Sequence, residues 1–115
     1  MAIAELYSGT ETVSTTEWSL TTDTAGPDVD TTDGVFQPFI DISALVGADL
    51  YQFRVYEKAR GADTQRVVYE AFMGGKPGDP IWTCPALILM HGWDMTLLKV
   101  AGTDRLITWS IRQLT

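Results

Sequence analysis

Apolar and polar residues alternate along several short segments of this chain. The clearest are residues 50–59, 65–73, 93–100 and 105–114. Alternation with a period of two places one set of side chains in a core and leaves the other in solvent, which is typical of a half-buried strand. No segment carries the apolar spacing of a long helix, so the sequence favours an all-β fold.

Turn-forming residues divide the chain at intervals of roughly ten residues. This spacing predicts about seven or eight short strands, a number that suits a sandwich or a small barrel. Short loops favour antiparallel pairing, and the chain lacks the crossover helices that a parallel sheet needs. We therefore predict a single antiparallel β-sandwich with a jelly-roll-like topology and an extended N-terminal segment.

Local patterns refine this prediction. Residues 35–42 form a predicted strand that contains Pro38, and a proline, which has no N–H, belongs at a sheet edge or a bulge. Residues 101–104, Ala-Gly-Thr-Asp, predict a tight hairpin loop between the last two strands. On that hairpin Trp93 and Trp109 fall among aliphatic residues, which predicts core packing rather than a sugar-stacking platform.

The charges are distributed unevenly. Residues 1–53 contain nine acidic residues and no basic one, whereas residues 54–115 contain six acidic and eight basic residues. The net charge of −7 argues against a duplex-binding protein, because phosphate neutralisation needs clustered Lys and Arg. An acidic half beside a mildly basic half suits docking between copies or on a basic protein, and a simply solvated acidic segment is the alternative.

A chain of 115 residues suits one domain, which we divide into two parts. Residues 1–33 are predicted to be a Thr-rich acidic N-terminal arm or edge strands, and residues 34–115 the β-sandwich body. Trp18 is isolated among threonines, which indicates an interface residue or an anchor. The candidate partner interface combines it with three acidic residues: Glu11, Glu17 and Asp23. Such an arm can add a strand to a partner's sheet, so removal of residues 1–24 is expected to leave the body folded.

Residues 87–94, Leu-Ile-Leu-Met-His-Gly-Trp-Asp, resemble the strand that leads into the oxyanion loop of α/β-hydrolases. Such enzymes also need a Gly-x-Ser-x-Gly elbow and a base histidine. The chain has no such pentapeptide, and His91 is its only histidine. We therefore interpret His91 and Gly92 as a bend that joins two strands, and we predict that the protein is not an enzyme.

The single cysteine, Cys84, excludes an intrachain disulfide and a thiolate zinc site. It lies in an apolar stretch, where a thiol behaves as a small hydrophobe. Three aspartates leave a loose calcium site open: Asp28, Asp30 and Asp33. The alternative is an exposed loop whose Asp and Thr side chains bond to their own backbone, and no cofactor is predicted.

No apolar run in the sequence is long enough to span a bilayer. The first residues lack the basic and apolar regions of a secretion signal. Because the chain has one cysteine, we expect it to fold in a reducing cytoplasm.

Residues 49–113 resemble small structural proteins of tailed bacteriophages. The motifs that carry the resemblance are Asp-Leu-Tyr-x-Phe-x-Val-Tyr-Glu-Lys, Val-Tyr-Glu, Gly-Trp-Asp-x-Thr-Leu, Ala-Gly-Thr-Asp and Trp-Ser-Ile-Arg. In such phages, small all-β proteins decorate or cement the capsid, or belong to the head–tail junction or the tail. The resemblance supplies no residue with a known role.

The resemblance implies a non-enzymatic virion structural protein, in the first place a capsid decoration protein. Its expected partners are the major capsid protein and neighbouring copies of itself in a homo-oligomer, without nucleic acid or membrane. It would be made in the host bacterial cytoplasm and lie on the capsid surface of the virion. One alternative is a head–tail connector or tail component, and the other is a calcium- or glycan-binding β-module.

Overall fold

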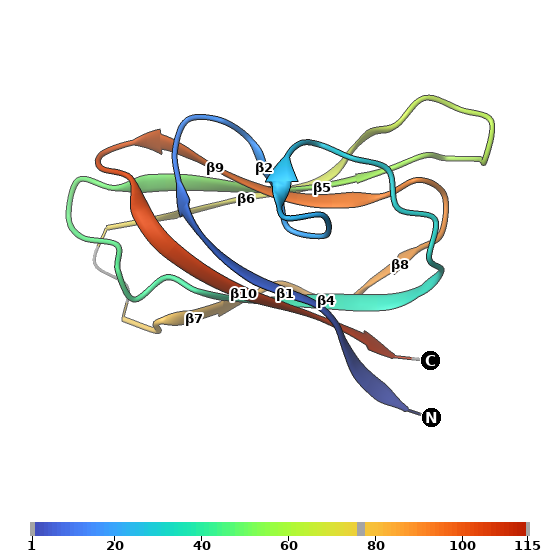
Figure 1. Cartoon of the computed structure of the whole chain (residues 1–115), viewed down its shortest axis with the longest axis horizontal. Coiled ribbons are helices and arrows are strands. Elements are labelled where there is room, and N and C mark those ends of the chain that lie inside the picture. The colour runs from blue at the N-terminus through green and yellow to red at the C-terminus, as the bar shows by residue number, and fades with distance from the viewer. Residues whose placement is uncertain (1, 76–77, 115) are drawn as a thin grey trace.

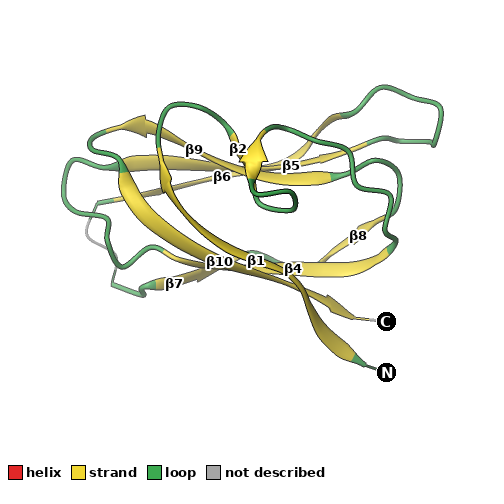
Figure 2. Cartoon of the chain, viewed as in Figure 1, coloured by secondary structure: helices red, strands yellow, loops and turns green. Residues whose placement is uncertain are grey.

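The structure is a computed structural model that describes residues 2–75 and 78–114. Ten strands form two five-stranded antiparallel sheets, which pack face to face as a sandwich (Figures 1 and 2). The prediction of an antiparallel all-β sandwich is confirmed, and the part of the chain that the structure describes contains no helix.

The two sheets are named A and B. Sheet A has the order β1, β10, β4, β7, and β8 also pairs with β4; sheet B has the order β3, β2, β9, β5, β6. The strands of sheet A are β1 (Ile3–Val13), β4 (Gly34–Asp41), β7 (Ile81–Thr83), β8 (Leu87–Leu89) and β10 (Arg105–Leu114). Those of sheet B are β2 (Trp18–Ser19), β3 (Thr24–Ala25), β5 (Leu50–Glu57), β6 (Arg66–Gly74) and β9 (Asp94–Ala101).

The number of strands exceeds the predicted seven or eight. The difference arises among the shortest strands, β2, β3, β7 and β8, which have only two or three residues each. A segment of that length is too short to show a period of two in the sequence.

The core lies between the two sheets and follows the alternation of the long strands. In β10, and in β4 from Phe36 to Ile40, every second side chain is buried. Trp93 and Trp109 are 0% and 2% exposed, which confirms that both belong to the core. The ring of Trp93 packs on that of Phe36, with 4.4 Å between centroids.

β9 and β10 do not form the predicted hairpin. β9 pairs with β2 and β5 in sheet B, whereas β10 pairs with β1 and β4 in sheet A. Residues 102–104 therefore connect the two sheets as an arch (Figure 1). The local sequence does not distinguish an arch from a hairpin, because the strands that flank either connection have one buried face.

Asp49 and Tyr51 hold this arch in place. The Asp49 carboxylate accepts hydrogen bonds from the backbone N–H of Thr103 (3.0 Å) and from Nε of Arg105 (2.8 Å). The Tyr51 hydroxyl donates to the carbonyl oxygen of Thr103 at 2.9 Å. Gly102 has a φ of +93° and lies so close to Asp49 that a Cβ would come within 2.3 Å of its carboxylate oxygen. The turn therefore requires glycine at this position.

The N-terminal segment is a strand of sheet A and not an extended coil. β1 pairs with β10 from Ile3 opposite Leu114 to Val13 opposite Arg105, and Figure 1 shows the two strands side by side. Val13 and, further along the segment, Leu20 are each 1% exposed in the core. Removal of residues 1–24 would take Val13 and Leu20 out of the core, so we now expect the truncated chain to be destabilised rather than to keep its fold.

Pro38 does not lie on an edge strand, since β4 is paired on both sides. The Pro38 carbonyl accepts a hydrogen bond from the Thr83 hydroxyl (2.7 Å), so this residue faces the β7 and β8 side. The N and O atoms of one residue in a strand point to the same side. The nitrogen of Pro38, which carries no hydrogen, thus faces the break between β7 and β8, where the sheet has no hydrogen bond to lose.

Candidate protein-binding surface

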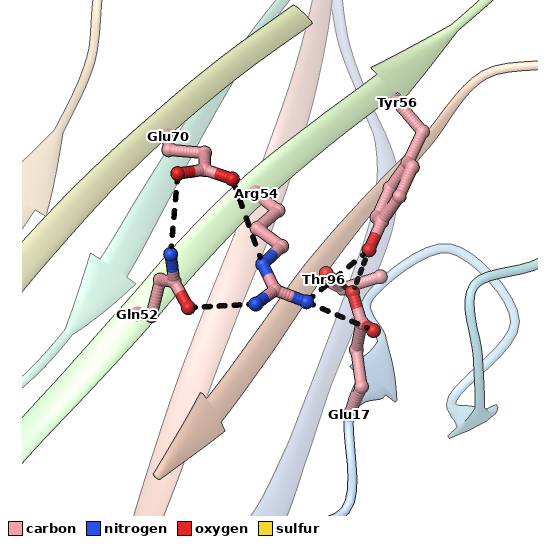
Figure 3. Close-up of polar contacts among 6 residues, drawn as sticks. All are labelled: Glu17, Gln52, Arg54, Tyr56, Glu70 and Thr96. Carbon is pink, nitrogen blue, oxygen red and sulfur yellow. Dashed lines mark hydrogen bonds and ion pairs between the residues drawn. The ribbon is translucent and has the colours of Figure 1, made fainter. Parts of the chain in front are cut away.

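Glu17, one of the predicted interface residues, is bound within the chain (Figure 3). Its carboxylate accepts hydrogen bonds from the hydroxyl groups of Tyr56 and Thr96, the latter at 2.5 Å. Nη1 of Arg54 lies 3.4 Å from its other oxygen. These three partners project from the outer face of β5 and β9, so Glu17 fixes the chain before β2 onto sheet B.

Arg54 stands between two carboxylates on this face (Figure 3). Opposite Glu17, its Nε lies 3.9 Å from Glu70, and its Nη2 donates to Gln52 at 2.9 Å. The hydrogen bond with Tyr56 and the neighbouring Glu17 charge raise the pKa of Arg54, while burial raises the pKa of Tyr56. The network is largely satisfied internally, and we assign it a structural role. Only Nε of Arg54 is buried without a hydrogen bond among the described residues.

Of the other predicted interface residues, Trp18 and Asp23 contact each other, and Glu11 lies on a different strand. Trp18 is half-buried against the core, and its Nε1 donates to the carboxylate of Asp23 at 3.0 Å. Glu11 lies on β1 opposite Ile107. The structure therefore joins Trp18 to Asp23 but does not gather the four residues into one surface.

Two of the three aspartates of the possible calcium site have separate side-chain partners. Asp28 accepts hydrogen bonds from the hydroxyl groups of Thr22 (2.5 Å) and Thr24 (3.1 Å). Asp30 accepts from the Tyr7 hydroxyl and from a backbone N–H. Across residues 2–75 and 78–114, no three His, Cys, Asp or Glu residues lie close enough together to hold a metal ion.

Asp94 is a buried carboxylate that sequence analysis did not single out. It is 0% exposed and accepts hydrogen bonds from the Thr21 hydroxyl (2.7 Å) and the backbone N–H groups of Asp28 (2.8 Å) and Met95 (2.9 Å). Burial raises its pKa. The side chain lies on the outward side of β9, so alternation predicts exposure, and the loop that covers it comes from a distant part of the sequence.

His91 and Gly92 form the bend that the sequence predicted. The backbone N–H of His91 donates to Glu57 at 2.9 Å, and its carbonyl accepts from Lys58 at 3.1 Å. Gly92 has a φ of +60°, which favours glycine. Elsewhere in the fold, Cys84 is buried, and burial raises the pKa of its thiol to about 11, so it is protonated at neutral pH.

An aliphatic row crosses the outer face of sheet A. Each member stands opposite the next on the neighbouring strand: Ile3, Leu114, Val35 and Ile88. The two ends of the row are the most exposed, Ile3 at 72% and Ile88 at 82%. Side chains of this type gain free energy when a partner removes them from water.

The surface beside the aliphatic row carries an aromatic residue and a cation. The guanidinium of Arg112 lies 3.9 Å from the centre of the Phe39 ring. A shallow hollow of about 280 Å³ separates this pair from Ile3, Val35 and Leu114. A row of exposed aliphatics beside an arginine and an aromatic ring has the composition of a protein-binding surface.

Comparisons with protein-family models, curated proteins and solved structures gave no match for this chain. Within the described residues, no helix is long and apolar enough to cross a membrane.

Proposed function

We propose that this protein is a non-enzymatic virion structural protein of a tailed bacteriophage, and specifically a capsid decoration protein. The observation that carries the proposal is the aliphatic row on sheet A. Exposed apolar groups gathered on one face mark a surface that another protein covers. We propose the major capsid lattice as that partner.

The shape of this surface supports a protein partner rather than a small ligand. The hollow beside the row is open, and small-molecule sites are clefts that enclose most of the ligand. Ile3 and Ile88 project from strands, which hold them rigidly and limit the entropy lost on binding. The pair formed by Arg112 and Phe39 supplies the residue types that are enriched at interface centres.

We also propose a jelly-roll-like topology for the sandwich. Its support is that the chain passes repeatedly from one sheet to the other: from β1 to β2, β3 to β4, β4 to β5, β6 to β7, β8 to β9 and β9 to β10. Such crossings wind the strands around a common core, as a jelly roll does.

The test begins with virions purified from the host that carries the gene. Mass spectrometry is expected to find the protein at an icosahedral copy number. A single ring of copies would instead support the head–tail connector or tail alternative. Absence of the protein from the virion would overturn the proposal.

A variant then tests the surface. Ile88→Ser should weaken binding to particles at least about tenfold, because it removes the most exposed member of the row from the contact. Leu106→Ser is the matched control, since Leu106 is 59% exposed on the same face but lies at the far end of β10. Full occupancy of capsids by the Ile88→Ser protein would contradict the assignment of this face.

A further inference from the structure

We propose that β1 pairs with β1 of a second copy, antiparallel and across a two-fold axis at Thr10. The two A sheets would then form one continuous sheet. This inference goes beyond the proposed function and does not depend on it, because it concerns the isolated protein in solution.

Among residues 2–75 and 78–114, two free sheet edges are long enough for such pairing. β1 has eleven residues and β6 has nine, whereas the other edge strands, β3, β7 and β8, have two or three. A long edge presents unpaired N–H and C=O groups in a row, which is a template for a strand of another chain.

The direction of the β1 backbone groups is fixed near its end by Tyr51. The Tyr51 hydroxyl lies between the carbonyl oxygen of Val13, at 3.3 Å, and the backbone N–H of Arg105, at 2.8 Å. Val13 and Arg105 stand opposite each other on β1 and β10. The carbonyl of Val13 therefore points toward β10.

The carbonyl of Ser14, the residue after β1, accepts a hydrogen bond from the backbone N–H of Lys99 in sheet B, at 2.8 Å. Backbone direction alternates along a strand, so the residues that alternate with Val13 point their N–H and C=O outward. These residues are Thr12, Thr10 and Ser8. They are exposed, and their outward backbone groups have no hydrogen-bond partner among residues 2–75 and 78–114.

A two-fold axis at Thr10 satisfies all of these groups together. Thr10 stands opposite Thr10 of the second copy, and Ser8 opposite its Thr12, so each outward-pointing residue meets another outward-pointing residue. Glu11, the one charged residue of this stretch, faces Gly9 and not another carboxylate. The Thr10 hydroxyl already lies 3.2 Å from that of Thr108, so the dimer would extend this pair into a threonine ladder.

The neighbouring registers are less favourable. An axis at Thr12 would place Ser14 opposite Thr10, but the Ser14 carbonyl is already bound to Lys99. An axis at Ser8 would carry the pairing into the bulge between Glu5 and Tyr7. Thr10 is therefore the axis that uses the unbulged part of the edge.

Both long edges carry a bulge, at Val68 in β6 and at Leu6 in β1. Charged residues stand on both sides of the β6 bulge, Arg66 and Glu70, and bulges and charges are the devices that block edge pairing. The bulge of β1 lies toward the start of the strand, so residues 8–12 contain no bulge and no proline, and Glu11 is their one charged residue.

Cysteine cross-linking tests the register directly in a Cys84→Ser background. Thr10→Cys should give a covalent dimer on oxidation, because directly opposite Cα atoms lie about 5.5 Å apart, within disulfide range. Ser8→Cys and Thr12→Cys should stay monomeric alone, since neither faces its own copy, but the double variant should cross-link. Cross-linking of Ser8→Cys as efficiently as Thr10→Cys would contradict the register.

Analytical ultracentrifugation, without cysteine substitutions, tests whether the protein dimerises through the edge of β1. The wild type should dimerise with concentration, and Thr10→Lys should weaken the dimer at least about tenfold by placing like charges opposite each other. Thr10→Pro should do the same without disturbing β10, because it removes an outward N–H. A monomeric wild type at every soluble concentration would overturn the proposal. So would a dimer that Thr10→Lys leaves intact and Phe72→Lys on β6 abolishes.

Discussion

The indole ring of Trp109 lies against the backbone of Gly9 on the neighbouring strand. A Cβ on Gly9 would come within 2.6 Å of the ring, so the absence of a side chain is what admits the indole. The Nε1 of the same ring donates to the carbonyl of Leu20 at 2.9 Å. Trp109 thereby joins β1 to the start of the loop that covers sheet B.

We predict that Gly9→Ala lowers the free energy of unfolding by about 1–3 kcal/mol, because the added methyl group overpacks the contact with Trp109. Urea unfolding at equilibrium measures the change. Ser8→Ala is the matched control on the adjacent exposed position and should stay within about 0.5 kcal/mol of the wild type. A Gly9→Ala protein as stable as the wild type would show that the ring moves freely.

The stability of the arch should depend on pH through Asp49. Hydrogen bonds from the backbone of Thr103 and Val46, and from Arg105, lower the pKa of Asp49 from 3.8 to about 2. Because the folded pKa lies below the unfolded one, the ionised carboxylate stabilises the fold above pH 4, and this contribution is lost as the pH falls from about 4 to about 2. Denaturant midpoints measured across that range should fall less steeply for Asp49→Asn.

The Glu17–Arg54 pair should show a measurable coupling energy. In a double-mutant cycle with Glu17→Ala and Arg54→Ala, we expect about 1–2 kcal/mol, because both side chains are largely shielded, at 18% and 28% exposure. The exposed pair Arg60–Asp63 is the control, where Arg60 is 85% exposed and the coupling should stay below about 0.5 kcal/mol. Equal coupling energies in the two pairs would contradict the anchoring role of Glu17.

The loop that covers sheet B should loosen when Asp94 is removed. Asp94→Ala leaves the Thr21 hydroxyl and the backbone N–H of Asp28 without their acceptor. We expect this to lower the free energy of unfolding by about 1–3 kcal/mol. Hydrogen exchange should then accelerate in residues 19–28 before the rest of the fold. Asp33 is an exposed aspartate of the following loop, so Asp33→Ala is the control. It should change neither the free energy of unfolding nor the exchange rate in residues 19–28.

The sequence predicted β4, β5, β6, β9 and β10 because a period of two is a local property, whereas β1 was predicted only as part of an arm or edge strands. Trp93 and Trp109 lie in the core as predicted, and the buried faces of β5 and β10 follow the alternation. β6 and β9 follow it only in part, because Val67 is exposed and Asp94 and Thr96 are buried. The assignment of strands to sheets is not local. Whether Gly102 turns a hairpin or an arch depends on Asp49, which lies more than fifty residues earlier in the chain.

The candidate surface escaped sequence analysis for the same reason. The aliphatic row takes one residue from each of four strands, so no segment shows it alone. Ile88 even belongs to an apolar stretch that resembles core. Glu17 and Trp18 did stand out in the polar segment, but the partners that bind Glu17 lie on β5 and β9, which only the folded chain brings near.

The pairing of β1 with β10 has a consequence for how the protein is made. Ribosomes deliver the N-terminal residues first, at about 5–20 residues per second, and β10 is the last of the ten strands to emerge. Until then β1 has no partner in sheet A, and its backbone is open on both sides. Pairings between such distant segments also fold slowly, typically in milliseconds to seconds. The nascent chain therefore carries an unpaired strand through most of its synthesis. The polar Thr and Ser side chains of β1 keep that strand soluble until β10 is made.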